Sequence, residues 1–197
     1  MAEEWLTLLR NVRTTRRKLA AGETLFRAGD AANAMFHVEQ GRIRLVRHGL
    51  DGHPVTLHVA GQGEPFAEAS LFSDVYHCDA VADEASELRA YPKAAVLLLL
   101  KAHPALNLAF SAYLARQLQR LRGRFELVRI KSARERVLAY LTQAGAVDGV
   151  VTLDRPLTLV AGEIGLTREA LYRTLAKLEK EGTLTRDGTR AFRLHAT

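Results

Sequence analysis

Residues 163–175 read EIGLTREALYRTL, and this stretch decides the fold of the C-terminal part of the chain. Gly165 marks a tight turn and Thr167 is a favourable N-cap, so the sequence predicts one helix over residues 158–164 and a second over 168–181. Gly182 follows the second helix, and the pair Asp187-Gly188 predicts a hairpin within residues 183–194. Helix, turn, N-capped helix and hairpin are the layout of a winged helix-turn-helix.

In such a unit the second helix enters the major groove of DNA with its N-terminal residues at the base edges. An arginine can make a bidentate contact to guanine, and a glutamate can accept from the amino group of cytosine. Basic residues further along the helix and on the hairpin are placed to reach phosphates. The alternative is a surface ion-pair network on an ordinary helix, but the complete arrangement favours DNA. The expected DNA-binding residues are Thr167, Arg168, Glu169, Arg173, Lys177, Arg186 and Arg190.

Upstream of this unit the apolar pattern is helical. Ser132 with Glu135 forms a capping box before a predicted helix over residues 133–143, followed by a strand over 150–153 and a turn at Arg155-Pro156. Before it, a long helix starts in the region of Pro104 and carries apolar residues at spacings of 4, 3, 4 and 3, as in a coiled-coil seam. The seam residues are Leu114, Leu118, Leu121, Phe125 and Val128. So narrow a seam favours a parallel homodimer over a helix packed on its own sheet.

The formal charge of +6 is unevenly distributed. Residues 1–103 hold 12 basic and 13 acidic residues, whereas residues 104–197 hold 16 and 9. A near-neutral front half and a basic back half indicate that the back half meets a polyanion, although an arginine-rich solvated helix face is the alternative.

Residues 1–103 have a β pattern. Short strands are predicted over residues 35–38, 42–47, 55–59, 77–82 and 86–90, separated by glycine-rich turns that include Asp51-Gly52. In the second of these strands, Ile43 and Leu45 are expected on one face and the arginines on the other. Many short strands at this spacing favour a small barrel or β-roll, and a short apolar helix over residues 93–101 follows them.

Two segments of the front half, residues 22–30 (GETLFRAGD) and 36–45 (FHVEQGRIRL), together with residues 163–175, resemble the Crp/Fnr family of bacterial transcription regulators. The resemblance covers nearly the whole chain and implies an α+β fold with three parts. These would be a cyclic-nucleotide-binding-like β-roll (1–103), a dimerisation helix (104–131) and a winged helix-turn-helix (132–197). It also implies a homodimer on a palindromic operator of double-stranded DNA, with RNA polymerase as a further partner. Arg168, Glu169 and Arg173 are similar to the residues of the catabolite activator branch that read a TGTGA-type half-site.

The effector positions depart from the cyclic-AMP-binding branch of that family. Its ribose-binding Gly-Glu corresponds to Ala67-Glu68, its phosphate-binding Arg-Ser to Cys78-Asp79, and its adenine-contacting Thr-Ser to Leu121-Arg122. An aspartate repels a phosphate, so these residues argue against cyclic AMP bound in the usual way. The open alternatives for the β-roll are an unidentified ligand, a haem or Cys78-based redox sensor acting mainly through protein partners, and a roll that senses nothing.

Other classes of protein lack support in the sequence. The single cysteine, Cys78, excludes an internal disulfide and an iron–sulfur cluster, and no metal-ligand spacing or catalytic motif is present. Cys78 itself is expected to be a small buried residue, in a strand where His77 points to the opposite face. The longest apolar run, residues 94–100, is too short to cross a bilayer, and residues 1–5 do not have the pattern of a signal peptide, so we expect a cytoplasmic protein without a membrane partner.

Overall fold

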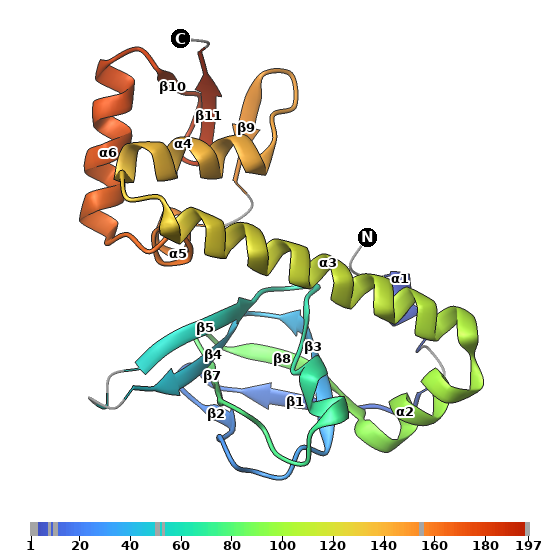
Figure 1. The fold of residues 1–197 in the computed structure, drawn as a ribbon. Coiled ribbons are helices and arrows are strands. Elements are labelled where there is room, and N and C mark those ends of the chain that lie inside the picture. The colour runs from blue at the N-terminus through green and yellow to red at the C-terminus, as the bar shows by residue number, and fades with distance from the viewer. Residues whose placement is uncertain are drawn as a thin grey trace. The chain divides into compact units, whose positions relative to one another are not determined.

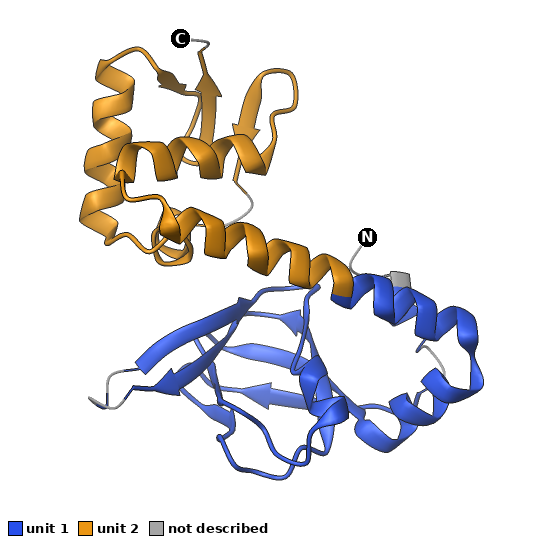
Figure 2. Cartoon of the chain, in the orientation of Figure 1, with its two compact units in different colours: residues 1–114 blue, residues 115–197 orange. Residues whose placement is uncertain are grey.

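A computed structural model describes residues 4–7, 9, 12–49, 52, 54–153 and 156–195 (Figure 1). The chain forms two compact units, residues 1–114 and residues 115–197 (Figure 2). The boundary falls inside the helix α3 (Pro104–Arg129), which starts at the proline that the sequence placed in its first turn. Each unit has its own hydrophobic core.

The first unit contains two four-stranded antiparallel sheets. One has the order β1 (Thr15–Leu19), β8 (Ser86–Pro92), β3 (Ala34–Gln40), β6 (Pro65–Phe66). The other has the order β2 (Thr24–Phe26), β7 (Asp79–Ala82), β4 (Ile43–His48), β5 (Pro54–Ala60). Aromatic rings fill much of the core: Phe26 stacks on Tyr76 with 3.7 Å between ring centroids, and Phe36 stacks against both Phe26 and Phe66. The predicted antiparallel roll is therefore present.

A second core in this unit is mostly helical. It joins α1 (Glu4–Thr7), α2 (Lys93–Ala102), the first turns of α3 and the 3-10 helix η1 (Glu68–Phe72). Trp5 is 1% exposed and meets Phe110 edge to face at 4.8 Å between centroids.

In the described part of the chain no single helix is long and apolar enough to span a membrane. The helices α2 and α3 have the required length and composition only when taken together, and they are bent by 114° relative to each other.

Several local predictions need correction. β7 begins at Asp79, so His77 and Cys78 lie in a bend before the strand, and the alternation of strand faces does not separate them. Cys78 is also only partly buried. In β4, Ile43 is buried and the half-buried Leu45 packs against the same core, as the sequence predicted, while Val46 is buried as well. The pairing of β4 with β5 shifts its register between Leu45 and Val46, and the extra residue, Leu57, lies in β5.

Three strands of the roll were missed by the sequence analysis, and two predicted turn residues lie outside the described part of the chain. β1, β2 and β6 were not predicted, because β1 is highly charged and the other two have only three and two residues. Two predicted turn residues, Asp51 and Arg155, lie outside the described residues.

The second unit has three further helices and a small sheet. The helices are α4 (Ala133–Ala144), α5 (Leu157–Glu163) and α6 (Arg168–Lys180). The antiparallel sheet has the order β10 (Leu184–Arg186), β11 (Ala191–Leu194), β9 (Val150–Thr152). Leu127 of α3 is 1% exposed and belongs to the core of this unit. The elements lie where the sequence predicted them to within about two residues, the usual uncertainty of a helix end.

Candidate nucleic-acid interface and effector positions

The turn before α6 has the geometry that its sequence predicts. Gly165 has φ +63°, a left-handed conformation that favours glycine, and the Leu166 amide donates to the Ala161 carbonyl at 2.9 Å. The Thr167 hydroxyl accepts from the amide of Ala170 at 3.1 Å and so caps α6. α6 therefore begins at a defined residue directly after the turn.

α6 buries one face and exposes the other. Leu171, Leu175 and Leu178 are 2% exposed or less and pack in the core of the second unit. Their spacing of four and three leaves the opposite side of the helix in solvent. Glu169 and Arg173 lie on that side, and Thr167 and Arg168 are exposed at the start of the helix; these are the four residues expected to read bases.

The charged groups at the start of α6 have neighbours on the helix itself. The Arg168 guanidinium lies over the ring of Tyr172 at 5.6 Å from its centroid. The pKa of Glu169 is lowered by its backbone amide first, and then by the Thr167 hydroxyl. Glu169 is thus an anion at the positive end of a helix, available as an acceptor.

The expected phosphate contacts differ in their surroundings. Lys177 is exposed and lies 3.9 Å from Glu181, and Arg190 is exposed in the hairpin turn. Arg186 is half-buried, and its Nε lies 3.6 Å from the Glu179 carboxylate of α6. Arg186 would need to leave this ion pair before it could reach a phosphate. Lys177 and Arg190 are therefore more accessible to a phosphate than Arg186.

Arg136 of α4 was missed by the sequence reasoning. Its guanidinium donates to the carbonyl of Ile130 at the end of α3 and to the carbonyls of Ile164 and Gly165, both at 3.0 Å, in the turn before α6. One side chain thereby joins three segments around the helix-turn-helix. In the sequence it resembles the neighbouring arginines of an amphipathic helix, so no signal distinguished it.

A second polar contact holds the last turns of α3 to the same unit. Arg124 pairs with Glu163 of α5 at 3.0 Å, and the Tyr140 hydroxyl of α4 donates to the other oxygen of that carboxylate at 3.3 Å. The side chain of Val128 lies against Gly165. The end of α3 and the helix-turn-helix are therefore parts of one packed body.

The predicted seam of α3 is exposed in the single chain. The exposed fractions run from 39% to 63% for Leu114, Leu118, Leu121, Phe125 and Val128. By contrast, Leu106, Phe110 and Tyr113 on the same helix are 3% exposed or less. Five large apolar residues in solvent at coiled-coil spacing are typical of a helix that has a partner.

In the β-roll, Glu68 already has a partner. It starts η1 after Ala67, whose φ of 59° is left-handed, and its carboxylate accepts a hydrogen bond from the Tyr113 hydroxyl of α3. Burial raises the pKa of Glu68, an effect that the Tyr113 hydrogen bond opposes. The chain thus satisfies internally the carboxylate that corresponds to the ribose-binding residue.

Cys78 and Asp79 lie near Arg47, but their environment does not suit a phosphate. Asp79 accepts from the Ala28 amide at 2.8 Å, and Arg47 donates to the carbonyl of His77 at 3.0 Å. Burial raises the pKa of the Cys78 thiol, and Arg47 opposes that shift. A raised pKa keeps the thiol protonated, which does not favour an activated redox cysteine.

The remaining effector positions, Leu121 and Arg122, are exposed and belong to the second unit. Among the residues described, no group of three or more His, Cys, Asp or Glu side chains could hold a metal ion.

Comparison with known proteins identifies the family. The model of the cyclic nucleotide-binding domain matches residues 16–103. The chain is 32% identical over 173 residues to the cyclic AMP receptor protein of Thermus thermophilus, covering 86% of this chain and 79% of that protein. The solved catabolite activator protein of Thermus thermophilus is 30% identical, with a TM-score of 0.55 and coverage of 99% and 91%. FixK2 of Bradyrhizobium japonicum shares the fold with a TM-score of 0.70 at 21% identity, over 94% of each chain.

The chain belongs to the Crp/Fnr family, as the sequence motifs predicted. It is a DNA-binding transcription regulator of that family and not an enzyme.

Proposed function

We propose that the protein acts as a homodimer on a palindromic operator, with α6 of each protomer in the major groove. The observation that carries this proposal is the exposed face of α6, where Glu169 and Arg173 lie opposite three buried leucines and Arg168 is exposed at the start of the helix. Arg173 and Glu169 are one turn apart, so one helix face presents a guanidinium and a carboxylate to base edges. A TGTGA-like half-site matches this pair of groups.

The dimer is supported by the exposed seam of α3. Burial of such a seam against its copy would remove five large apolar side chains per protomer from water. A twofold dimer places its recognition helices in two major grooves about one helical turn, roughly 34–36 Å, apart. The operator would therefore be palindromic.

The effector, if there is one, is not cyclic AMP bound as in the cyclic-AMP-binding branch. The Glu68 carboxylate is hydrogen-bonded to the Tyr113 hydroxyl, and Asp79 is a carboxylate at a position that corresponds to the phosphate-binding pair of that branch. The proposal includes RNA polymerase as a partner and the cytoplasm as the location, as for a bacterial transcription regulator.

The experiment is fluorescence anisotropy with the 197-residue chain and a duplex that carries two inverted TGTGA half-sites. Arg173→Ala should cost roughly 1–3 kcal/mol per half-site and relax the preference at the contacted base. Affinity should also fall steeply with salt, because each phosphate contact releases counterions.

Lys93→Ala, in the first unit, is a matched loss of charge outside the proposed interface. Equal affinity for the operator and for a duplex with scrambled half-sites would refute the proposed specificity. An Arg173→Ala protein that keeps both affinity and base preference would refute the role of that residue.

A further inference from the structure

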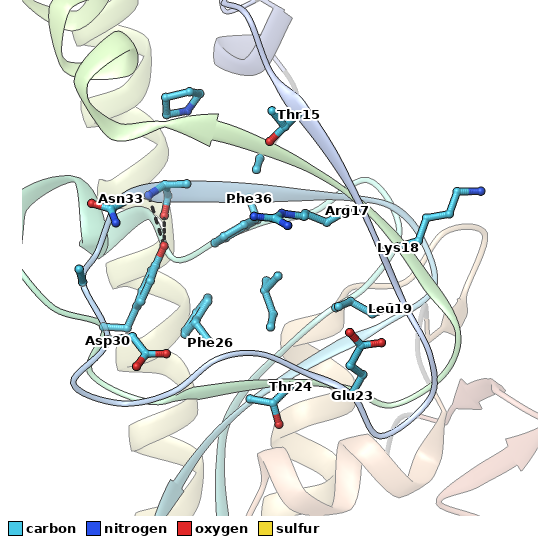
Figure 3. Close-up of a pocket in the computed structure, with 16 residues that line it drawn as sticks. Thr15, Arg17, Lys18, Leu19, Glu23, Thr24, Phe26, Asp30, Asn33 and Phe36 are labelled. Carbon is cyan, nitrogen blue, oxygen red and sulfur yellow. Dashed lines mark hydrogen bonds between the residues drawn. The ribbon is translucent and has the colours of Figure 1, made fainter.

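The first unit has a cavity of about 450 Å³ between the edge strands of its two sheets (Figure 3). β1 is the edge of one sheet and β2 the edge of the other, and the start of β3 contributes further lining residues. Glu68, Cys78 and Asp79 do not line it. It is therefore distinct from the positions at which the family resemblance places a cyclic nucleotide.

The floor of this cavity is apolar. Phe26, Phe36 and Tyr76 line it and are 6–7% exposed. The Tyr76 hydroxyl donates to the Ala34 carbonyl at 2.8 Å and accepts from the Ala34 amide at 3.3 Å. Because that hydroxyl is satisfied by the backbone, the rings offer the cavity carbon surface.

Arg17 and Lys18 are the two cationic residues that line this cavity. Alternation along β1 puts the charged ends of Arg16 and Lys18 on the outer face, where they pair with Glu39 at 3.7 Å and Glu87 at 2.6 Å, so Lys18 already has an acidic partner although it contributes to the lining. Arg17 points the other way, toward Phe36 (Figure 3). Arg17 is exposed to solvent, and within the described residues no hydrogen bond or ion pair of its side chain is found.

The acidic residues at the rim have other partners. Glu23 accepts from the amide of Ala20 at 2.9 Å, and Asp30 accepts from the amide of Arg27 at 2.8 Å. Both carboxylates thus close local turns, but they keep their negative charge and oppose an anionic ligand, so the attraction for a carboxylate has to come from Arg17. An unpaired guanidinium beside an apolar floor matches a ligand with one carboxylate and an apolar body.

We propose that this cavity binds a small monocarboxylate, aliphatic or aromatic, with its carboxylate on Arg17 and its body on Phe26, Phe36 and Tyr76. The cavity volume lies within the roughly 300–1,000 Å³ of small-molecule sites. The site does not depend on how α6 recognises DNA. It gives the β-roll a ligand class that differs from a nucleotide.

The test is isothermal titration calorimetry of the 197-residue chain with octanoate and with 3-phenylpropionate, each beside its uncharged amide. Both acids, or one of them, should bind more tightly than the matching amide, and the preferred acid distinguishes an aliphatic from an aromatic body. Arg17→Gln should weaken carboxylate binding roughly 10- to 100-fold, the range for a charge-assisted hydrogen bond. Arg17→Lys should restore part of the affinity. Arg16→Gln, on the outer face of the same strand, should bind as the unaltered protein does.

Several results would overturn the proposal. The first is that the amides bind as tightly as the acids, and the second is that Arg16→Gln and Arg17→Gln weaken acid binding equally. The third is that the unaltered protein, shown to be folded by a cooperative thermal melt, does not bind either acid at millimolar concentration. If Arg17 only prevents the edge strand β1 from pairing with another chain, the protein should not bind the acids, and the Arg17→Gln variant should tend to aggregate. Operator binding measured without acid reports on the proposed function separately, so the two proposals can fail independently.

Discussion

Replacing Arg136 with methionine should loosen the helix-turn-helix without changing any residue that faces DNA. Methionine keeps most of the apolar stem but removes the guanidinium that bonds the carbonyls of Ile130, Ile164 and Gly165. A hydrogen bond to a charged group contributes about 1.5–3 kcal/mol when buried. Arg136 is only half-buried, so we take about 1 kcal/mol for each of three carbonyls, or about 3 kcal/mol in all.

Amide hydrogen exchange followed by mass spectrometry measures this change locally. A loss of about 3 kcal/mol should speed exchange in residues 161–175 by roughly 100-fold, because exchange there follows the local opening equilibrium. Affinity for the operator should fall as well, since the start of α6 is held less firmly.

Arg134→Met is the matched control on the same helix. Arg134 bonds Glu181 and Thr183, both 3.2 Å away, at a more exposed site, where such pairs contribute about 0–1 kcal/mol. Unchanged exchange in residues 161–175 of Arg136→Met would refute the reasoning, as would an equal effect of the two variants.

Three further predictions concern the seam, the roll and one turn. Leu121→Glu should raise the dimer dissociation constant by about 100-fold or more, because a twofold seam loses two apolar side chains and gains two charges. Sedimentation velocity should show a monomer for Leu121→Glu and a dimer for the control Gln119→Glu, which adds a charge outside the seam. A Leu121→Glu protein that remains a dimer would contradict dimerisation through the seam. Glu68 holds its proton to higher pH in the folded chain than its ordinary pKa of 4.5, so stability should fall as pH rises through the folded pKa of Glu68. In the Glu68→Gln variant the melting temperature should fall less over this pH range, because the residue can no longer titrate. If the melting temperatures of the variant and the unaltered protein fall equally with pH, the prediction is wrong. Gly41→Ala should destabilise the roll more than Gly29→Ala in thermal melts. Both glycines have φ near +90°, a strain of about 1–3 kcal/mol for alanine, but only the Cβ at position 41 would lie 2.3 Å from Ser86 Oγ. Equal losses would contradict the clash.

Much of this architecture follows from local sequence. The capping residues Ser132 and Thr167, the glycine after Ile164 and the 4-3 spacing of leucines act within one or two turns of chain, so their effects can be read without knowing the fold. The antiparallel roll was predicted for the same reason, from short β patterns between glycine-rich turns. The exposed face of α6 also followed, because burying Leu171, Leu175 and Leu178 leaves only one side in solvent.

Other features depend on residues that are far apart in the chain. The bend at Cys78 and the register shift between β4 and β5 depend on strand pairing, which a linear pattern does not specify. Arg136 acquires its role from carbonyls 6 to 29 residues away, and Glu68 acquires its partner from a tyrosine 45 residues away.

The sequence by itself determined the family, from three motif segments, and the apolar seam of α3 and the exposed face of α6, from spacings of three and four residues. Only the tertiary structure decided that Glu68 is bonded to Tyr113 and that Arg17 points into a cavity floored by three aromatic rings. The physical reason is that burial and hydrogen bonding of a side chain depend on which distant segments pack against it, and the local pattern of residues does not contain that information.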